Sequence, residues 1–104
     1  MPRTAILYAR SQRRDELDRQ VRELENWCER AGVVPVDTVE GVALGTRVSK
    51  RCREVLADVA AGRAHLVLIR DFSRLSKNSD QLREIVNVYR NRIAISRDDL
   101  DHSR

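Results

Sequence analysis

Two short segments of the sequence place hydroxyl and guanidinium side chains directly after apolar runs. One follows the run at residues 4–8, where Arg10 stands beside Ser11. The other reads Arg-Asp-Phe-Ser-Arg-Leu-Ser-Lys-Asn-Ser over residues 70–79 and follows the run at 65–69. Arginine stays protonated at neutral pH and binds phosphate through charge-assisted hydrogen bonds. A hydroxyl nucleophile among such cations suits phosphate chemistry, because positive charge stabilises both an ionised hydroxyl and a transferring phosphate.

Other kinds of phosphate or cofactor site are not encoded. The Gly-x-Gly-x-x-Gly fingerprint of dinucleotide-binding proteins and the Walker loop are both missing. A phosphatase loop needs an arginine six residues after its cysteine, but Val34 and Asp58 occupy those positions. A Mg²⁺-dependent phosphoacceptor needs several acids at strand ends, where Glu40 and Asp71 are the only candidates. The two histidines are too isolated to build a metal site, so neither a metal nor a cofactor is expected.

The pattern of apolar residues predicts the elements that position these two segments. Apolar residues at three- and four-residue steps are typical of amphipathic helices, and short apolar runs are typical of strands. Pro35 cannot donate to a ladder, which places its strand at a sheet edge. We expect helices at about 14–31, 50–61 and 79–90, strands at 4–8, 33–38, 65–69 and 93–95, a long loop at 40–51 and a frayed tail at 98–104.

The alternation of strands and helices predicts an α/β fold with a parallel sheet of four strands, or slightly more, flanked by helices. Right-handed crossovers and the edge position of the second strand favour the spatial order 2-1-3-4. In such sheets ligands bind beyond the carboxyl ends of the strands, where the winding direction reverses. That point lies between the first and third strands, so the segments Tyr8–Arg14 and Asp71–Asn78 are expected to converge there.

Composition sets the broad class of the protein. A chain of 104 residues, 41% of them hydrophobic, is expected to form one domain over 1–104 with a core of its own. The net charge is +4, and 18 of the 20 cations are arginine, which is a weak indication of nucleic acid. Cys28 and Cys52 fall on apolar helix faces and are expected to be buried thiols. No apolar run approaches a membrane span and no signal peptide is evident, so the protein is expected to be cytoplasmic and away from membranes.

Several motifs in order resemble the catalytic domain of the serine recombinases, the resolvase/invertase family, over nearly the whole chain. They begin with Ala5-Ile-Leu-Tyr-Ala-Arg10-Ser11 and Leu17-Asp-Arg-Gln20. They continue with Glu40-Gly41 and Gly45-Thr46 before a basic cluster, and close with Phe72-Ser-Arg-Leu-Ser-Lys-Asn78. The resemblance implies a resolvase-like sheet, which is also flavodoxin-like in outline.

The resemblance also implies site-specific cleavage and exchange of double-stranded DNA through a serine joined covalently to a 5′ phosphate, without metal or cofactor. The active assembly it implies is a tetramer built from dimers. Carried over by motif, Ser11 is the nucleophile, Arg10 and Arg74 bind the phosphate, and Tyr8 and Gln20 support the site. The remaining catalytic and DNA-phosphate-binding candidates are Glu40, Arg47, Arg51 and Lys77.

The chain departs from the family pattern at several positions. The usual motif is Tyr-x-Arg-x-Ser, whereas Arg10 and Ser11 are adjacent; counting forward from Tyr8 puts Gln12 at the serine position. Ser73 stands where the family often has aspartate, and Lys77 replaces a third arginine. The loop arginine aligns ambiguously among Arg47, Ser49, Lys50 and Arg51. We also expect the long helix and the DNA-binding region that normally follow in the family to be absent.

These departures leave alternatives open. Ser11 could instead cap the first helix, and Arg10 could form a salt bridge to Asp15 or Glu40. At the level of function, the alternative is a catalytically degenerate recombinase-like module that binds or modulates a partner recombinase. A third possibility is an unrelated flavodoxin-like domain that binds a small ligand. The Arg10–Ser11 adjacency distinguishes the active recombinase from the degenerate module. Strand side chains alternate with a period of two, so if the strand continued through Ser11, its hydroxyl would lie on the face of the sheet opposite to the catalytic one.

Overall fold

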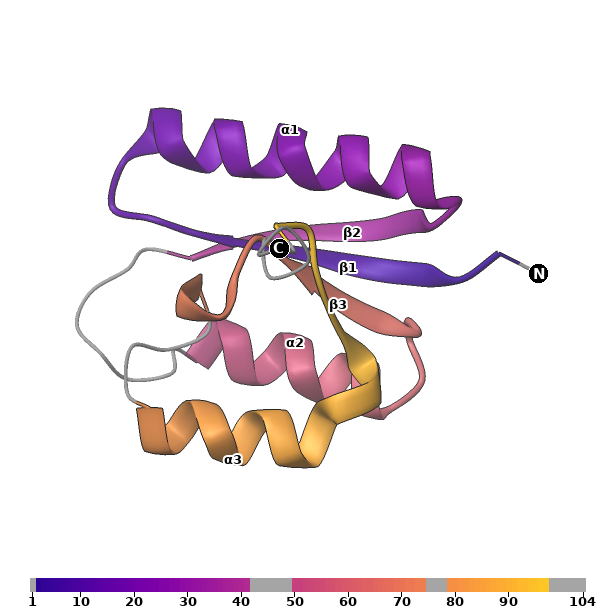
Figure 1. Ribbon diagram of the computed structural model, residues 1–104, viewed down its shortest axis with the longest axis vertical. Coiled ribbons are helices and arrows are strands. Elements are labelled where there is room, and N and C mark those ends of the chain that lie inside the picture. The colour runs from indigo at the N-terminus through magenta and orange to yellow at the C-terminus, as the bar shows by residue number, and fades with distance from the viewer. Residues whose placement is uncertain (1, 42–49, 75–78, 98–104) are drawn as a thin grey trace, which may run out of the picture.

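The computed structural model describes residues 2–41, 50–74 and 79–97. A four-stranded sheet has α1 on one face and α2 and α3 on the other (Figure 1). The helices are α1 (Arg14–Ala31), α2 (Lys50–Ala60) and α3 (Ser79–Tyr89), with short 3-10 turns η1 (Phe72–Arg74) and η2 (Arg90–Arg92). The strands are β1 (Thr4–Arg10), β2 (Val34–Gly41), β3 (Leu66–Ile69) and β4 (Ile93–Ile95).

The strands run in the order β2-β1-β3-β4, and all three pairings are parallel. The predicted order and the parallel sheet are therefore confirmed. Pro35 lies in the edge strand β2, as predicted from its missing N–H. The register of β2 against β1 shifts at Pro35, so that Val36 is an extra residue between those paired with Ala5 and Ile6.

Alternation along the two central strands builds a core on each face of the sheet. On β1, Ala5 and Leu7 face α1, whereas Ile6 and Tyr8 pack on the other face with Val55 of α2. The same alternation occurs in β3, whose four residues are all buried. A strand buried on both faces reads as a continuous apolar run, which is why these segments were recognisable in the sequence.

Helix α1 ends where the sequence predicts, because Gly32 adopts the left-handed conformation with a φ of 72°. The N–H groups of Gly32 and Val33 both donate to the Cys28 carbonyl, which satisfies the last turn of the helix. The helix lays Leu17, Leu24 and Cys28 on the sheet, and both cysteines of the chain are buried thiols. No helix within the described ranges is long and apolar enough to span a bilayer.

Two strands run past their predicted ends: β1 continues to Arg10 instead of residue 8, and β2 continues to Gly41 instead of residue 38. The start of α2 at Lys50 confirms the helix predicted at about 50–61, so the predicted 40–51 loop is strand at its first residues and helix at its last two. β2 runs on because its last four residues pair with Leu7–Arg10 of β1, a long-range interaction that the polar sequence does not reveal. The rest of that loop and the predicted frayed tail lie outside the described residues.

Candidate catalytic site

The two segments singled out by sequence meet at the carboxyl edge of the sheet. β1 leads through Ser11 into α1, and β3 leads through Arg70 and Asp71 into η1. In Figure 1 this edge lies on the left, where α1, α2 and α3 also begin. Helix starts carry partial positive charge, so the edge favours an anionic ligand.

Gln20 holds the last residue of β1 from within α1. The Arg10 N–H donates to Gln20 Oε1 at 3.1 Å, and Gln20 Nε2 donates to the Arg10 carbonyl at 3.0 Å. Gln20 is completely buried. The carboxamide therefore binds both the N–H and the carbonyl of Arg10. Gln20 thus lies at the site, where it contacts the backbone of Arg10.

Arg74 reaches the same carbonyl from the other segment. Its Nη1 donates to the Arg10 carbonyl at 2.9 Å, and its Nε lies 3.4 Å from Asp71 Oδ1. Because this carbonyl carbon is bonded to the nitrogen of Ser11, the contact brings the Arg74 guanidinium beside the Arg10–Ser11 peptide. The Arg74 side chain thus meets the end of β1 at the backbone of Arg10.

Ser11 follows the last residue of β1 but still takes part in the hydrogen-bond pattern of the sheet. Its N–H donates to the Gly41 carbonyl at 3.2 Å, so the pairing with β2 continues one residue past β1. Its Oγ accepts the N–H of Arg13 at 3.1 Å. Arg13 is the residue that caps α1, so the alternative that Ser11 is the N-cap is wrong by two positions. The hydroxyl therefore lies toward the start of α1.

Arg10 and Tyr8 share the opposite face of β1. Tyr8 is completely buried, and Arg10 is only 3% exposed. Tyr8 packs with Cys52 and Val55 of α2, and alternation along β1 places Arg10 on the same face of the sheet. Burial raises the pKa of the Cys52 thiol to about 11, and the positive charge of Arg10 opposes that rise. Arg10 and Ser11 therefore extend toward different helices, which is the geometry expected when one residue between them is missing.

Gly41 is required by the position of the Tyr8 ring. A Cβ added at Gly41 would lie 2.8 Å from the Tyr8 hydroxyl, closer than real Cβ atoms approach other heavy atoms. A larger residue at this position would therefore force the Tyr8 ring or the end of β2 to shift.

The acids proposed as partners for Arg10 are engaged by other arginines. Glu40 binds Arg14 at 2.6 Å, and Asp15 binds Arg13 at 2.8 Å and Arg19 at 3.1 Å. Glu40 is therefore held at the edge by an ion pair to the first residue of α1. The hydrogen bond to Glu40 is the main cause of a raised pKa for Arg14. The hydrogen bond from Arg13 is the main cause of a lowered pKa for Asp15.

An ion pair that the sequence did not predict joins the same two segments. Glu16 in the first turn of α1 accepts a hydrogen bond from Arg70, which follows β3. Both side chains are largely shielded, at 25% and 17% exposed, and the Arg70 hydrogen bond lowers the pKa of Glu16. The position of Arg70 directly after a strand indicated that it lies at the carboxyl edge. Its partner could not be predicted from the sequence pattern, because Glu16 lies 54 residues away.

Three predicted phosphate-binding residues are not placed at this site by the described residues. Arg51 lies exposed in the first turn of α2. Arg47 and Lys77 lie outside the described residues.

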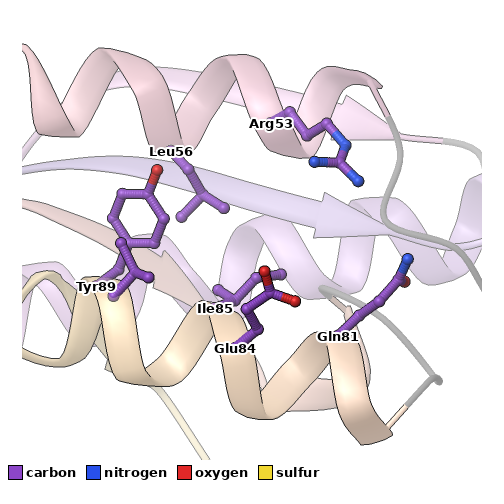
Figure 2. Close-up of a pocket in the computed structure, with 7 residues that line it drawn as sticks. Arg53, Leu56, Gln81, Glu84, Ile85 and Tyr89 are labelled. Carbon is purple, nitrogen blue, oxygen red and sulfur yellow. The ribbon is translucent and has the colours of Figure 1, made fainter.

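A groove elsewhere on the molecule has a different character. It measures about 310 Å³ and lies between α2 and α3, with Arg53 and Leu56 of α2 facing Glu84, Ile85 and Tyr89 of α3 (Figure 2). It is lined by side chains of α2 and α3 and by none of the predicted site residues within the described part of the chain. The groove is thus separate from the carboxyl edge.

Known proteins with a similar structure include catalytic domains of a serine recombinase and of an integrase. The chain is similar in structure to the C-terminal catalytic domain of ISC1926 TnpA, an IS607-like serine recombinase, with a TM-score of 0.73 and 23% identity over 96% of this chain and 76% of that one. It is also similar to the N-terminal catalytic domain of TP901-1 integrase, with a TM-score of 0.73 and 19% identity over 86% of this chain and 72% of that one. At these identities the two structures show a shared fold.

No protein with curated annotation matched the sequence. The family profile described as "Resolvase, N terminal domain" matches residues 5–95, which include both segments of the carboxyl edge. The chain therefore belongs to the resolvase N-terminal domain family.

Proposed function

We propose that the domain cleaves double-stranded DNA and exchanges its strands, with Ser11 as the nucleophile. The observation that carries this proposal is the hydrogen bond from Arg74 Nη1 to the Arg10 carbonyl, 2.9 Å long, which joins the serine-bearing segment to a cation from the other segment. Family membership supports the recombinase class. A DNA substrate also agrees with the expected cytoplasmic location.

The proposed reaction transfers a phosphoryl group between oxygens. The Ser11 oxygen forms a bond to phosphorus and loses its proton to solvent. The bond from phosphorus to the 3′ oxygen breaks, and that oxygen takes up a proton and leaves as a 3′ hydroxyl. The 5′ phosphate is then held on Ser11 until a 3′ hydroxyl from another cleaved strand attacks it and releases the serine. Because a phosphodiester exchanges one oxygen for another, the reaction needs no external energy source.

The cations have separate roles in this proposal. Arg74, 22% exposed and fixed by Asp71 and the Arg10 carbonyl, binds the transferring phosphate. Arg10 supplies positive charge from beneath the edge, with Lys77, Arg47 and Arg51 as further phosphate contacts. Tyr8, Gln20 and Glu40 hold these groups in place. The active assembly is proposed to be a dimer that pairs into a tetramer, because exchange needs four cleaved strands at once.

A second candidate is a recombinase-like module that joins a partner recombinase without cutting DNA. It is favoured by the different directions taken by Arg10, buried near Cys52, and Ser11, whose Oγ accepts the Arg13 N–H at 3.1 Å. For cleavage, the segment at Ser11 would have to turn its hydroxyl toward Arg74 when DNA binds.

A nicked suicide substrate distinguishes the two candidates. The protein is joined to the DNA-binding region of a characterised serine recombinase and given that recombinase's site, with EDTA present. We expect a covalent protein–DNA adduct that Ser11→Ala abolishes and that Arg74→Gln slows by roughly 10²–10³, as when one donor to a transition-state oxyanion is lost. Lys77→Arg should preserve or raise the yield, because arginine adds bidentate geometry.

Gln12→Ala is the matched control, because Gln12 is the other residue that alignment places at the nucleophile position. It should leave the adduct intact. No adduct with the native sequence, or an adduct that persists in Ser11→Ala, would favour the module without cleavage activity.

A further inference from the structure

A second group of basic side chains lies at the opposite edge of the sheet, where the strands begin. A cleft of about 390 Å³ is lined there by Arg3, Gly62, Ala64, His65, Asn91 and Arg92. Arg3, His65 and Arg92 directly precede β1, β3 and β4. Three neighbouring parallel strands therefore carry a basic residue each to one cleft. In Figure 1 this edge lies on the right, beside the N-terminus and the turn between α2 and β3.

His65 is fixed so that it offers a hydrogen-bond donor. The Thr4 N–H donates to Nδ1 of His65 at 2.9 Å, and the His65 N–H donates to the Thr4 carbonyl at 3.0 Å. A ring nitrogen that accepts an N–H carries no proton, so the neutral ring has its proton on Nε2. The remaining nitrogen of the imidazole, Nε2, is thus a donor.

Arg92 is also held in place, with donors to spare. Its Nη1 donates to the Val59 carbonyl at 2.9 Å, at the end of α2. The following turn binds three carbonyls of this helix end: the N–H groups of Ala61, Arg63 and Gly62 donate to Ala57, Asp58 and Val59 at 2.9, 3.0 and 3.0 Å. Among the described contacts, Nε and Nη2 of Arg92 have no acceptor.

The charge of the cleft is not balanced by its own lining. None of the six lining residues is acidic, and within the described ranges neither Arg3 nor Arg92 forms an ion pair. Asp58, at the end of α2, is engaged by Arg63 at 3.0 Å. The cleft therefore offers two guanidinium groups, an imidazole N–H and the carboxamide of Asn91 to a ligand that brings negative charge.

We propose that this cleft binds a phosphate group. Donors that arrive from three strands and a turn suit the several oxygens of a tetrahedral anion better than the two coplanar oxygens of a carboxylate. The group can belong to a small phosphorylated molecule or to a nucleic-acid backbone, and the recognition chemistry is the same. The site shares no residue with the carboxyl edge, so it does not depend on the proposed strand exchange.

The test is an amide NMR titration of the 104-residue protein with inorganic phosphate, with chloride lowered to keep ionic strength constant. We expect saturable shifts at Thr4, His65 and Arg92. Arg3→Gln and Arg92→Gln should each weaken this binding roughly tenfold, the effect of losing one charge-assisted hydrogen bond of about 1.4 kcal/mol. Arg3→Gln removes a side chain with no hydrogen bond among the described contacts, so it should leave the fold unchanged even if Arg92→Gln loosens α2.

Arg22→Gln is the matched control, since Arg22 is exposed on α1, which covers the other face of the sheet from α2, and does not line the cleft. It should bind phosphate as the native protein does. A parallel titration with a short DNA duplex identifies the source: shifts at the same amides assign a backbone phosphate, and shifts with phosphate alone assign a small molecule. Phosphate shifts confined to the Arg10 and Arg74 edge, or equal losses in all three arginine variants, would overturn the proposal.

Discussion

At the scale of single residues, the end of β1 is organised around one peptide group. The Arg10 carbonyl accepts hydrogen bonds from both Gln20 and Arg74, so its two lone pairs are used by two different elements. Gln20 also accepts the Arg10 N–H. The backbone beside Ser11 is thereby held by side chains that the sequence separates by 54 residues.

Gln20→Leu should therefore destabilise the protein although it adds an apolar group to a buried site. The substitution leaves the Arg10 N–H without its acceptor, which costs about 1–3 kcal/mol. Urea denaturation followed by circular dichroism measures the change. Asn26→Leu on the exposed face of α1 is the control and should have little effect. Equal stabilities for native protein and Gln20→Leu would show that the carboxamide is dispensable.

Gly41→Ala tests the contact between the end of β2 and the buried ring of Tyr8. The added Cβ would meet the Tyr8 hydroxyl at 2.8 Å, so the ring or the strand must shift, at a cost of about 1–3 kcal/mol. Tyr8→Phe removes the clashing oxygen. In a double-mutant cycle by urea denaturation, the loss from Gly41→Ala should shrink in the Tyr8→Phe background. Purely additive free energies would place the strain elsewhere.

At the scale of elements, the sequence predicted the helices and central strands well and the edge strand poorly. Helix α1 was predictable to the residue, because its apolar stripe ends at a glycine. The last three residues of β2, 39–41, were not, since Glu40 and Gly41 do not extend the apolar pattern of the strand predicted at 33–38. These residues are strand only because β1 supplies the hydrogen-bond partners, and pairing across the chain is invisible to a local pattern.

The Glu16–Arg70 ion pair joins α1 to the end of β3 and should give the protein a pH-dependent stability. Arg70 lowers the pKa of folded Glu16, so this contribution is complete above the unfolded pKa, about 4.3, and is lost as the pH falls through the folded value. Urea denaturation from pH 7 to pH 3 should show a loss on the order of 1 kcal/mol from this pair, smaller in Glu16→Gln.

Asp15→Asn provides the comparison for this pH series. The pKa of Asp15 is also lowered, chiefly by Arg13, but that pair is exposed at 55% and 72% and is screened by solvent and salt. Raising the salt concentration should erase the effect of Asp15→Asn first. A pH profile of Glu16→Gln that matches the native profile would remove Glu16 from the linkage.

At the scale of the whole molecule, the sequence predicted where the site lies on the sheet, but not how its side chains are arranged. Strand order alone brought Tyr8–Arg14 and the segment after β3 to one edge, and Arg74 contacts the Arg10 carbonyl there. The role of Gln20 as a backbone clamp and the pairing of Glu40 with Arg14 depend on side-chain packing, which spacing does not encode. The directions of Arg10 and Ser11 followed from strand alternation once β1 was known to reach Arg10.

Binding of the 104-residue chain to DNA should be weak and strongly dependent on salt. Its net charge is only +4, and exposed arginines reach backbone phosphates without reading bases. Fluorescence anisotropy with unrelated duplexes should give dissociation constants of about 10⁻⁴–10⁻⁶ M near physiological salt, tighter at 50 mM than at 200 mM. Nanomolar, sequence-selective binding would mean that the domain carries a base-reading element of its own.

The irregularity of β2 at Val36 bears on whether the protein aggregates. An eight-residue edge strand can pair with a strand of another molecule, and the exposed side chains of Val34 and Val36, 43% and 50% exposed, would add hydrophobic contacts to such a pairing. Pro35, however, has no N–H to donate to an added strand, and the extra residue Val36 interrupts the regular spacing of hydrogen-bonding groups. The Thr38 N–H already donates to Asp37 Oδ1 at 2.8 Å. These three local features leave the outer edge of β2 with fewer regularly spaced N–H groups for an added strand to pair with, so we expect this edge to be a poor template for aggregation.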